Sequence, residues 1–155
     1  MATEKWIAGS GQGLTYGNAF TGSTLNSIAS GNAILSDLQI DNSTALDIFA
    51  DVSIQLASAA FLAPNYIGVY LYPLNQDNTT YGDGRFGSSA AGPPASTYYV
   101  GSIVIVAATQ AQNGTLRGIV LPPAKFKFVL HNQGGVALAS SANVCLYRTY
   151  NRAVA

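Results

Sequence analysis

The stretch YPLNQDNTTYGDGRF, residues 72–86, holds the side chains best suited to bind a metal ion. It contains Asp77 and Asp83, two of the seven acidic residues, among asparagines and glycines. A calcium loop needs oxygen ligands at alternate positions before a glycine. Counted from Asp77, those positions hold Thr79 and Tyr81, and no glutamate follows to complete the shell. The spacing therefore favours a turn without a metal ion. Its candidate contact residues are Tyr81, Arg85 and Phe86.

The remaining residues with catalytic potential are few. His131 is the only histidine and Cys145 the only cysteine, which excludes a His-rich metal site and an internal disulfide. Cys145 lies in an apolar strand pattern and is expected to act as a small buried hydrophobe. Asp47 and Asp51 share one face of a predicted strand, ~13 Å apart, which is too far for the acid/base pair of a glycosidase. We expect them to be solvated charges, and we expect no enzyme activity, catalytic residue or cofactor.

These residues must be positioned by β-strands, because apolar residues alternate with a period of two almost everywhere. Residues 45–56 place one alternating set inside: Leu46, Ile48, Ala50, Val52, Ile54 and Leu56. Residues 65–73 place Ile67, Val69 and Leu71 inside, and residues 125–131 do the same with Phe126, Phe128 and Leu130. The opposite face of residues 65–73 is an outward row of tyrosines: Tyr66, Tyr70 and Tyr72.

Turns rich in Gly, Pro and Asn separate about eight such strands, which predicts an all-β fold. The expected architecture is an antiparallel two-sheet jelly-roll sandwich over residues 31–155. Residues 1–30 are rich in glycine and have isolated apolar residues without periodicity, so we expect an extended N-terminal arm. The apolar side chains of the arm are expected to fill pockets on the domain or on a neighbour: Trp6, Ile7, Leu14, Tyr16 and Phe20.

The composition points to a protein that works within an assembly. Only 9% of the residues are charged and the formal net charge is zero, so little repulsion keeps copies apart. The cations form no basic patch, which argues against nucleic-acid binding. No apolar run reaches the length of a membrane span, and the first residues lack the apolar core of a signal peptide. We therefore expect no membrane partner and a protein that is soluble and intracellular when made.

The tyrosine row has two interpretations. Aromatic strips on sandwiches can bind sugars, and tyrosines are also enriched at protein interfaces. Residues 97–107, which include Tyr99, are apolar on both strand faces. Such a strand in an antiparallel sandwich predicts that its outer face is covered, plausibly by another subunit. This pattern favours a protein contact and a homo-oligomer.

The run LPPAKFKFVLHNQGGVALASSANVCLYRTYN, residues 121–151, resembles the last strands of capsid decoration, or cement, proteins of tailed bacteriophages. The segments GSGQGLTYGNAF and YPLNQDNTTYGDGRF are similar to segments of the same family. The resemblance implies a jelly roll without catalytic residues that forms a dimer or trimer on the outer capsid surface of the virion. There it would bridge neighbouring major capsid subunits and stabilise the head. The alternative is a carbohydrate- or receptor-binding jelly-roll module of a phage tail or spike.

Overall fold

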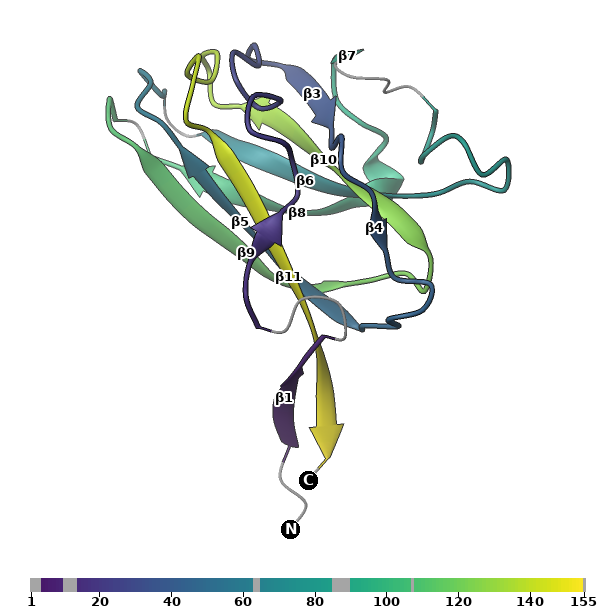
Figure 1. Cartoon of the computed structure of the whole chain (residues 1–155). Coiled ribbons are helices and arrows are strands. Elements are labelled where there is room, and N and C mark those ends of the chain that lie inside the picture. Colours follow the sequence, from purple (N-terminus) through teal and green to yellow (C-terminus); the bar gives the residue numbers. More distant parts are fainter. Residues whose placement is uncertain (1–3, 10–13, 63–64, 85–89, 107, 155) are drawn as a thin grey trace.

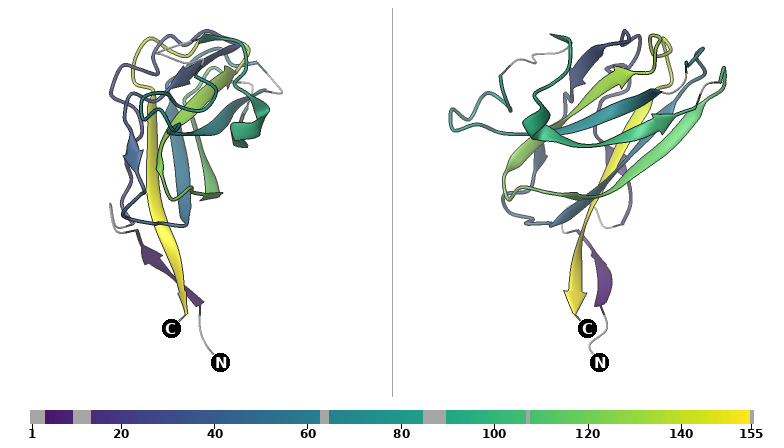
Figure 2. Two further views of the ribbon diagram at one scale, coloured as in Figure 1. Left: turned by 90° about the vertical axis from the view of Figure 1, so that its right-hand side faces the viewer. Right: turned by 180° about the vertical axis from the view of Figure 1, so that it is seen from behind.

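A computed structural model describes residues 4–9, 14–62, 65–84, 90–106 and 108–154. Strands form two antiparallel sheets that pack face to face (Figures 1 and 2). The all-β antiparallel sandwich predicted from the period-two pattern is thus confirmed. Within these ranges no helix is long and apolar enough to cross a membrane.

The first sheet contains, in spatial order, β1 (Glu4–Ala8), β11 (Val144–Val154), β5 (Phe49–Leu56) and β9 (Gln112–Val120), with β2 (Gly17–Asn18) also paired to β11. The second contains β7 (Ala90–Ala91), β3 (Asn32–Leu35), β10 (Lys125–Gln133), β6 (Asn65–Pro73) and β8 (Tyr99–Ile105), with β4 (Ile40–Asp41) also paired to β10. A 3₁₀ turn, Ser96–Tyr98, precedes β8.

Most connections cross from one sheet to the other, as they do in jelly rolls and other Greek-key sandwiches. The chain crosses between β4 and β5, β5 and β6, β8 and β9, β9 and β10, and β10 and β11. In contrast, β6 and β8 are neighbours in the second sheet. The connection between them is described at residues 74–84 and 90–98, and it includes β7, which pairs with β3 at the other edge of the same sheet.

The main core lies between the sheets and consists of side chains from alternate strand positions. The predicted inward residues Phe126 and Phe128 are fully buried, and the inward positions of β5 from Ala50 onward are buried as well. Leu46 and Ile48 were expected inside but are exposed. The reason is local: β5 begins only at Phe49, and Leu46 has a positive φ of 51° in the preceding turn.

Part of the expected arm belongs to this core. Phe20, Leu25 and Ile28 are buried between the sheets, and the amide of Ala19 donates to the carbonyl of Cys145 at 2.9 Å. Phe20 therefore fills a pocket on its own domain, and its side chain is not available as a contact residue. The described part of the N-terminal segment that extends beyond the sandwich is β1 (Figure 1).

A second, smaller hydrophobic cluster covers the outer face of the second sheet. Tyr70 and Tyr72 are buried in it, and Tyr98 from the 74–98 connection lies against Tyr72 with ring centroids 4.6 Å apart. Tyr81 from the same connection also packs here. Tyr70 and Tyr72 thus lie on the outer face as predicted, but they are wrong as interface residues, because the chain's own connection covers them. Only Tyr66 of that row is exposed.

A substitution at Gly82 tests how much the packing against Tyr72 in this cluster contributes to stability. The φ of Gly82 is +56°, and a Cβ at this position would lie 2.2 Å from the ring of Tyr72, which is fully buried. We expect Gly82→Ala to lower the free energy of unfolding by about 2–4 kcal/mol, through backbone strain and overpacking together. Chemical denaturation measures the change.

Gly84 provides the matched control, because its φ of +72° is similar but no atom lies within 4 Å of a Cβ there. Gly84→Ala should cost only the backbone strain, about 1 kcal/mol. Equal losses for the two variants would show that the packing of Gly82 on Tyr72 contributes nothing.

Candidate functional site

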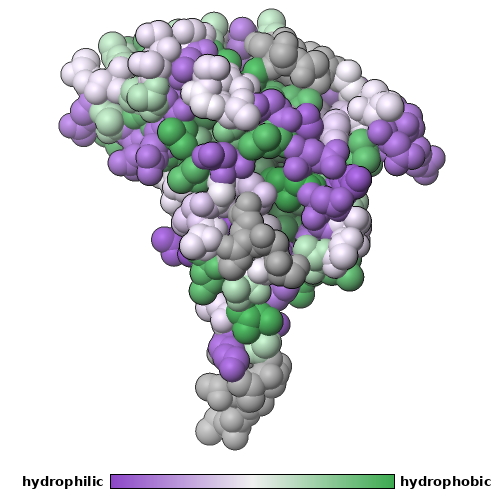
Figure 3. Space-filling model, in the orientation of Figure 1, coloured by the Kyte–Doolittle hydropathy of each residue, from purple (hydrophilic) through white to green (hydrophobic). Residues whose placement is uncertain are grey.

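β1 and the end of β11 form a two-stranded ribbon that projects from the sandwich (Figure 1). We call Glu4–Ala8 together with Tyr150–Val154 the ribbon; its register runs from Glu4 opposite Val154 to Ala8 opposite Tyr150. β5 starts at Phe49, opposite Tyr150, so it does not flank β11 beyond that residue. Two predicted arm contacts lie on the ribbon, and both are exposed: Trp6 and Ile7. Apolar surface is visible along the ribbon and at its junction with the sandwich (Figure 3).

An aromatic cluster joins the ribbon to the sandwich. The ring of Trp6 meets those of Phe49 and Tyr150 edge to face, with centroids 5.9 and 5.2 Å away. Phe49 and Tyr150 stack on each other at 5.7 Å, and Arg152 lies over the Trp6 ring. Such aromatic pairs contribute about 0.5–1.5 kcal/mol each beyond their burial. The cluster thus holds the base of an element that has little other packing.

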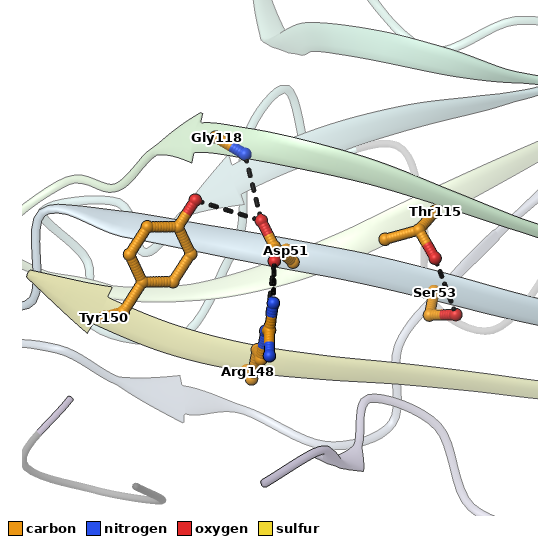
Figure 4. A network of polar contacts seen from close by, with 6 residues as sticks. All are labelled: Asp51, Ser53, Thr115, Gly118, Arg148 and Tyr150. Atoms are coloured by element: carbon orange, nitrogen blue, oxygen red, sulfur yellow. Dashed lines mark hydrogen bonds and ion pairs between the residues drawn. The ribbon is translucent and has the colours of Figure 1, made fainter. Parts of the chain in front are cut away.

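Next to this cluster, the carboxylate of Asp51 accepts four hydrogen bonds on the outer face of the first sheet (Figure 4). Oδ1 accepts from the amide of Gly118 at 3.1 Å and from the hydroxyl of Tyr150 at 3.0 Å. Oδ2 accepts from Nε and a terminal nitrogen of Arg148 at 3.0 and 2.7 Å. A carboxylate has about four lone-pair positions, so the acceptor capacity of Asp51 is filled.

The surroundings of Asp51 correct the expectation that Asp47 and Asp51 are solvated. Both are buried, with 3% and 2% relative exposure. β5 is an internal strand of the first sheet, and an irregularity in its pairing with β9 between Ala50 and Val52 brings the amide of Gly118 to Asp51. Asp47 is held separately, accepting a hydrogen bond from the side-chain amide of Asn151 at 2.9 Å.

The neighbours of Asp51 respond electrostatically to its charge. The hydrogen bond to Asp51 raises the pKa of Arg148, whose guanidinium also lies over the ring of Tyr16 at 4.9 Å. Tyr16, like Trp6, is thus a predicted arm residue whose ring meets a cationic side chain. Burial raises the pKa of Tyr150, and the hydrogen bond to Asp51 raises it further. At neutral pH this part of the sheet therefore holds a bound cation and a neutral phenol.

A groove of about 500 Å³ lies between the aromatic cluster and this carboxylate. We call it the groove. Its lining residues are Trp6, Leu14, Asp51, Arg117, Gly118, Arg148 and Tyr150. Sequence reasoning named Trp6 and Leu14 but missed Arg117, Arg148 and Tyr150. Strand alternation could have given a signal for the last two, since Arg148 and Tyr150 lie two positions apart on one face of β11.

The loop that could have bound a metal ion is organised by its own hydrogen bonds. Asp77 accepts from the hydroxyl of Thr80 at 2.6 Å and from the amides of Thr79 and Thr80, each at 2.9 Å. These bonds, that of the Thr80 hydroxyl first, lower the pKa of Asp77 to about 2. In the described part of the chain, no three His, Cys, Asp or Glu residues are grouped to hold a metal. Tyr81 donates to Gln39, while Arg85 and Phe86 lie outside the described residues.

The second sheet carries an exposed apolar patch at its β8 edge. We call Tyr66, Tyr99, Val104 and Val106 the edge patch; all four are exposed, Val104 most at 74%. Tyr66 and Val104 are direct cross-strand partners, and Tyr99 lies against Tyr70 with centroids 5.3 Å apart. The predicted interface residues Tyr66 and Tyr99 are thus both exposed at this edge but pair with different residues, Val104 and Tyr70. Tyr70 and Tyr72 are buried.

His131 and Cys145 are separated by the sandwich. Cys145 faces the main core, where burial raises the pKa of its thiol. His131 lies beside Tyr70 on the other side of the second sheet, and its Nε2 is 3.2 Å from the carbonyl of Gly31. Burial lowers the pKa of His131. The expected role of Cys145 as a small buried hydrophobe is confirmed, and the arrangement does not form a Cys–His pair.

Comparison with models of known protein families gives no match, and neither curated proteins nor solved structures show significant similarity to the chain.

The ion pair of Asp51 and Arg148 should contribute strongly to stability. Arg148→Met leaves the buried carboxylate with only the Gly118 and Tyr150 donors. Removal of one partner from a buried pair is costly, so we expect the free energy of unfolding to fall by about 3 kcal/mol. Thermal and urea denaturation at pH 7 measure the loss.

The exposed pair of Lys125 and Asp41, with side-chain exposures of 41% and 47%, is the matched control. Lys125→Met should change stability little, because solvent screens such pairs. If Arg148→Met lowered the free energy of unfolding as little as Lys125→Met, the ion pair of Asp51 and Arg148 would not contribute to stability as expected.

Proposed function

We propose that this protein is a structural virion protein that binds the outer surface of a phage capsid and bridges neighbouring major capsid subunits to stabilise the head. The resemblance of residues 121–151 to capsid decoration proteins motivates the proposal. The observation that carries it is the ribbon, a projecting two-stranded element on which Trp6 and Ile7 are exposed. A projecting element with exposed apolar side chains is suited to bind another protein.

The physics of two-stranded ribbons supports this role. An isolated pair of strands is at best marginally stable in water, because it has no second layer to pack against. Beyond Tyr150 the ribbon lacks a third strand from β5, and β1 is the last strand of its sheet. Open strand edges accept a further strand by main-chain hydrogen bonds. Capsid subunits would supply both the strand partner and the apolar cover.

Each bridge between capsid subunits needs to contribute only a small binding free energy. Many symmetric copies act at once on a capsid, so a few kcal/mol per bridge adds up over the shell. An ordered ribbon also loses less conformational entropy on binding than a disordered arm would. The aromatic cluster of Trp6, Phe49 and Tyr150 provides that order in the free protein.

The edge patch supports the second part of the proposal, that copies of this chain associate as a dimer or trimer. Tyr66 and Val104 face solvent at the β8 edge, which is the last strand of the second sheet. Apolar side chains beside an open edge are typical of subunit contacts. The ribbon and the edge patch lie on different sheets, so one can bind a capsid subunit while the other binds a sister copy.

Deletion of residues 1–8 tests capsid attachment. The deletion removes β1 but keeps Phe20 and the rest of the main core. We expect attachment to expanded capsids of the cognate phage to fall at least tenfold in a co-sedimentation assay, because the strand partner of the β11 end is lost. The melting temperature of the sandwich should change by no more than a few degrees.

A pair of point variants controls for general loss of apolar surface. Trp6→Ser should weaken attachment, whereas Leu62→Ser should not, although Leu62 is similarly exposed (55% against 60%). Leu62 follows the end of β5 that is remote from the ribbon. Undiminished attachment of the deletion variant would overturn the ribbon as the capsid-binding element.

Val104→Lys tests self-association. A charge placed on the edge patch should shift the protein from a dimer or trimer toward a monomer, as measured by light scattering coupled to size-exclusion chromatography. Val120→Lys is the matched control, since Val120 is 68% exposed on the edge strand of the other sheet. A monomeric wild type, or an oligomer that survives Val104→Lys, would contradict this interface.

A further inference from the structure

The polar groups of the groove are selective for an anion. The four hydrogen bonds to Asp51 fill its acceptor positions, so the protein's own donors already satisfy this carboxylate. Arg148 keeps N–H groups that Asp51 does not use, because a guanidinium has five. Arg117 is exposed and forms no ion pair with any described residue. The groove therefore offers hydrogen-bond donors and positive charge.

The opposite wall of the groove is apolar. Trp6 and Leu14 line it and are 60% and 52% exposed. Trp6 presents a large, rigid aromatic ring with a polar N–H, suited to pack against a flat apolar surface. The volume of about 500 Å³ suits a small molecule. A ligand that fits must combine an anionic group with an apolar ring face.

The floor of the groove argues against a peptide. Peptides that bind sheets usually add a strand at an open edge. β5, which carries Asp51, is hydrogen-bonded to β11 on one side and to β9 on the other, so its main-chain groups are used. A ligand lying across this face must bring its own polar groups and bind through side chains.

We propose that the groove binds an acidic sugar, that is, a saccharide that carries a carboxylate. The carboxylate pairs with Arg117 and the free N–H groups of Arg148, in the fork geometry that guanidinium and carboxylate share. The sugar ring lies against Trp6 and Leu14. This site goes beyond capsid attachment, because its charged partners, Arg117 and Arg148, are not part of the ribbon.

Titration of the full-length protein with glucuronic acid and N-acetylneuraminic acid, followed by NMR, tests the site. We expect saturable shifts with a Kd on the order of 1 mM, typical of a single weak contact site. The methyl ester of glucuronic acid keeps the ring but lacks the charge, and it should bind at least tenfold more weakly, since a charged hydrogen bond contributes about 1.5–3 kcal/mol.

Arg117→Gln should weaken binding of both acids by about tenfold or more, because it removes one charged partner. Arg117 is exposed, so the melting temperature should be unchanged. Lys125→Gln, on the second sheet, is the control and should bind like the wild type. Arg117→Gln should also retain attachment to capsids, which separates this site from the ribbon.

Four outcomes would overturn the proposal. Equal binding of the acid and its methyl ester would exclude carboxylate recognition. Unchanged affinity in Arg117→Gln would place the sugar elsewhere. Binding of a tetraglutamate peptide without binding of either sugar would make the groove a peptide site. No saturable shift at about 10 mM sugar would show that no site of the expected affinity exists.

Discussion

A charge buried in a sheet must be fully paired, and the first sheet is organised around one such charge. Asp51 is almost fully buried, and it links three strands by side-chain hydrogen bonds: its own β5, β9 through Gly118, and β11 through Arg148 and Tyr150. An unpaired carboxylate here would cost several kcal/mol. The requirement to pair it fixes the pairing irregularity between β5 and β9, the orientation of Tyr150, and hence the aromatic cluster. The ribbon depends on that cluster, so one ion pair in the sandwich positions an element that projects from it.

In the second sheet the outer face is apolar and part of it is covered by another segment of the chain. β6 and β8 are adjacent in one sheet, so the 74–98 connection runs back to that sheet and places Tyr81 and Tyr98 against Tyr70 and Tyr72. The hydrogen bonds of Asp77 and the left-handed backbone at Gly82 keep the connection tight enough to do this. The cover ends before Tyr66 and Val104, which is why apolar surface remains at the β8 edge.

The sequence allowed the sandwich to be predicted because alternation is a local property: Phe126, Phe128 and the inner face of β5 from Ala50 onward could be assigned from neighbours two residues apart. The sequence did not show whether residues on the outer faces of the sheets are buried or exposed, since that depends on partners far away in the chain. Asp51 is covered by Gly118 and Arg148, which lie 67 and 97 positions away in the sequence. Tyr72 is covered by the connection between β6 and β8, and the alternation of apolar residues does not predict the path of that connection. Phe20 was assigned to the arm for the same reason, because its segment has no periodicity although its side chain reaches the core. The groove could not be predicted, since Trp6, Arg117 and Arg148 converge only through the pairing of β1, β11, β5 and β9.

Because the chain carries few charged residues, the places where its cations lie determine which surfaces can bind an anion. With 9% charged residues, most of the surface neither repels nor steers a partner, so the position of each cation matters. Arg148 is committed to Asp51 and Lys125 to Asp41, whereas Arg152 lies over Trp6 and Arg117 at the margin of the groove. The positive charge of Arg117 lies at the groove that the exposed ring of Trp6 also lines, on the sheet that bears the ribbon. The edge patch on the other sheet has no such charge among its four residues. The two surfaces are chemically distinct, one cationic and aromatic and the other apolar, and such a difference allows a single small domain to bind two unlike partners without competition between them.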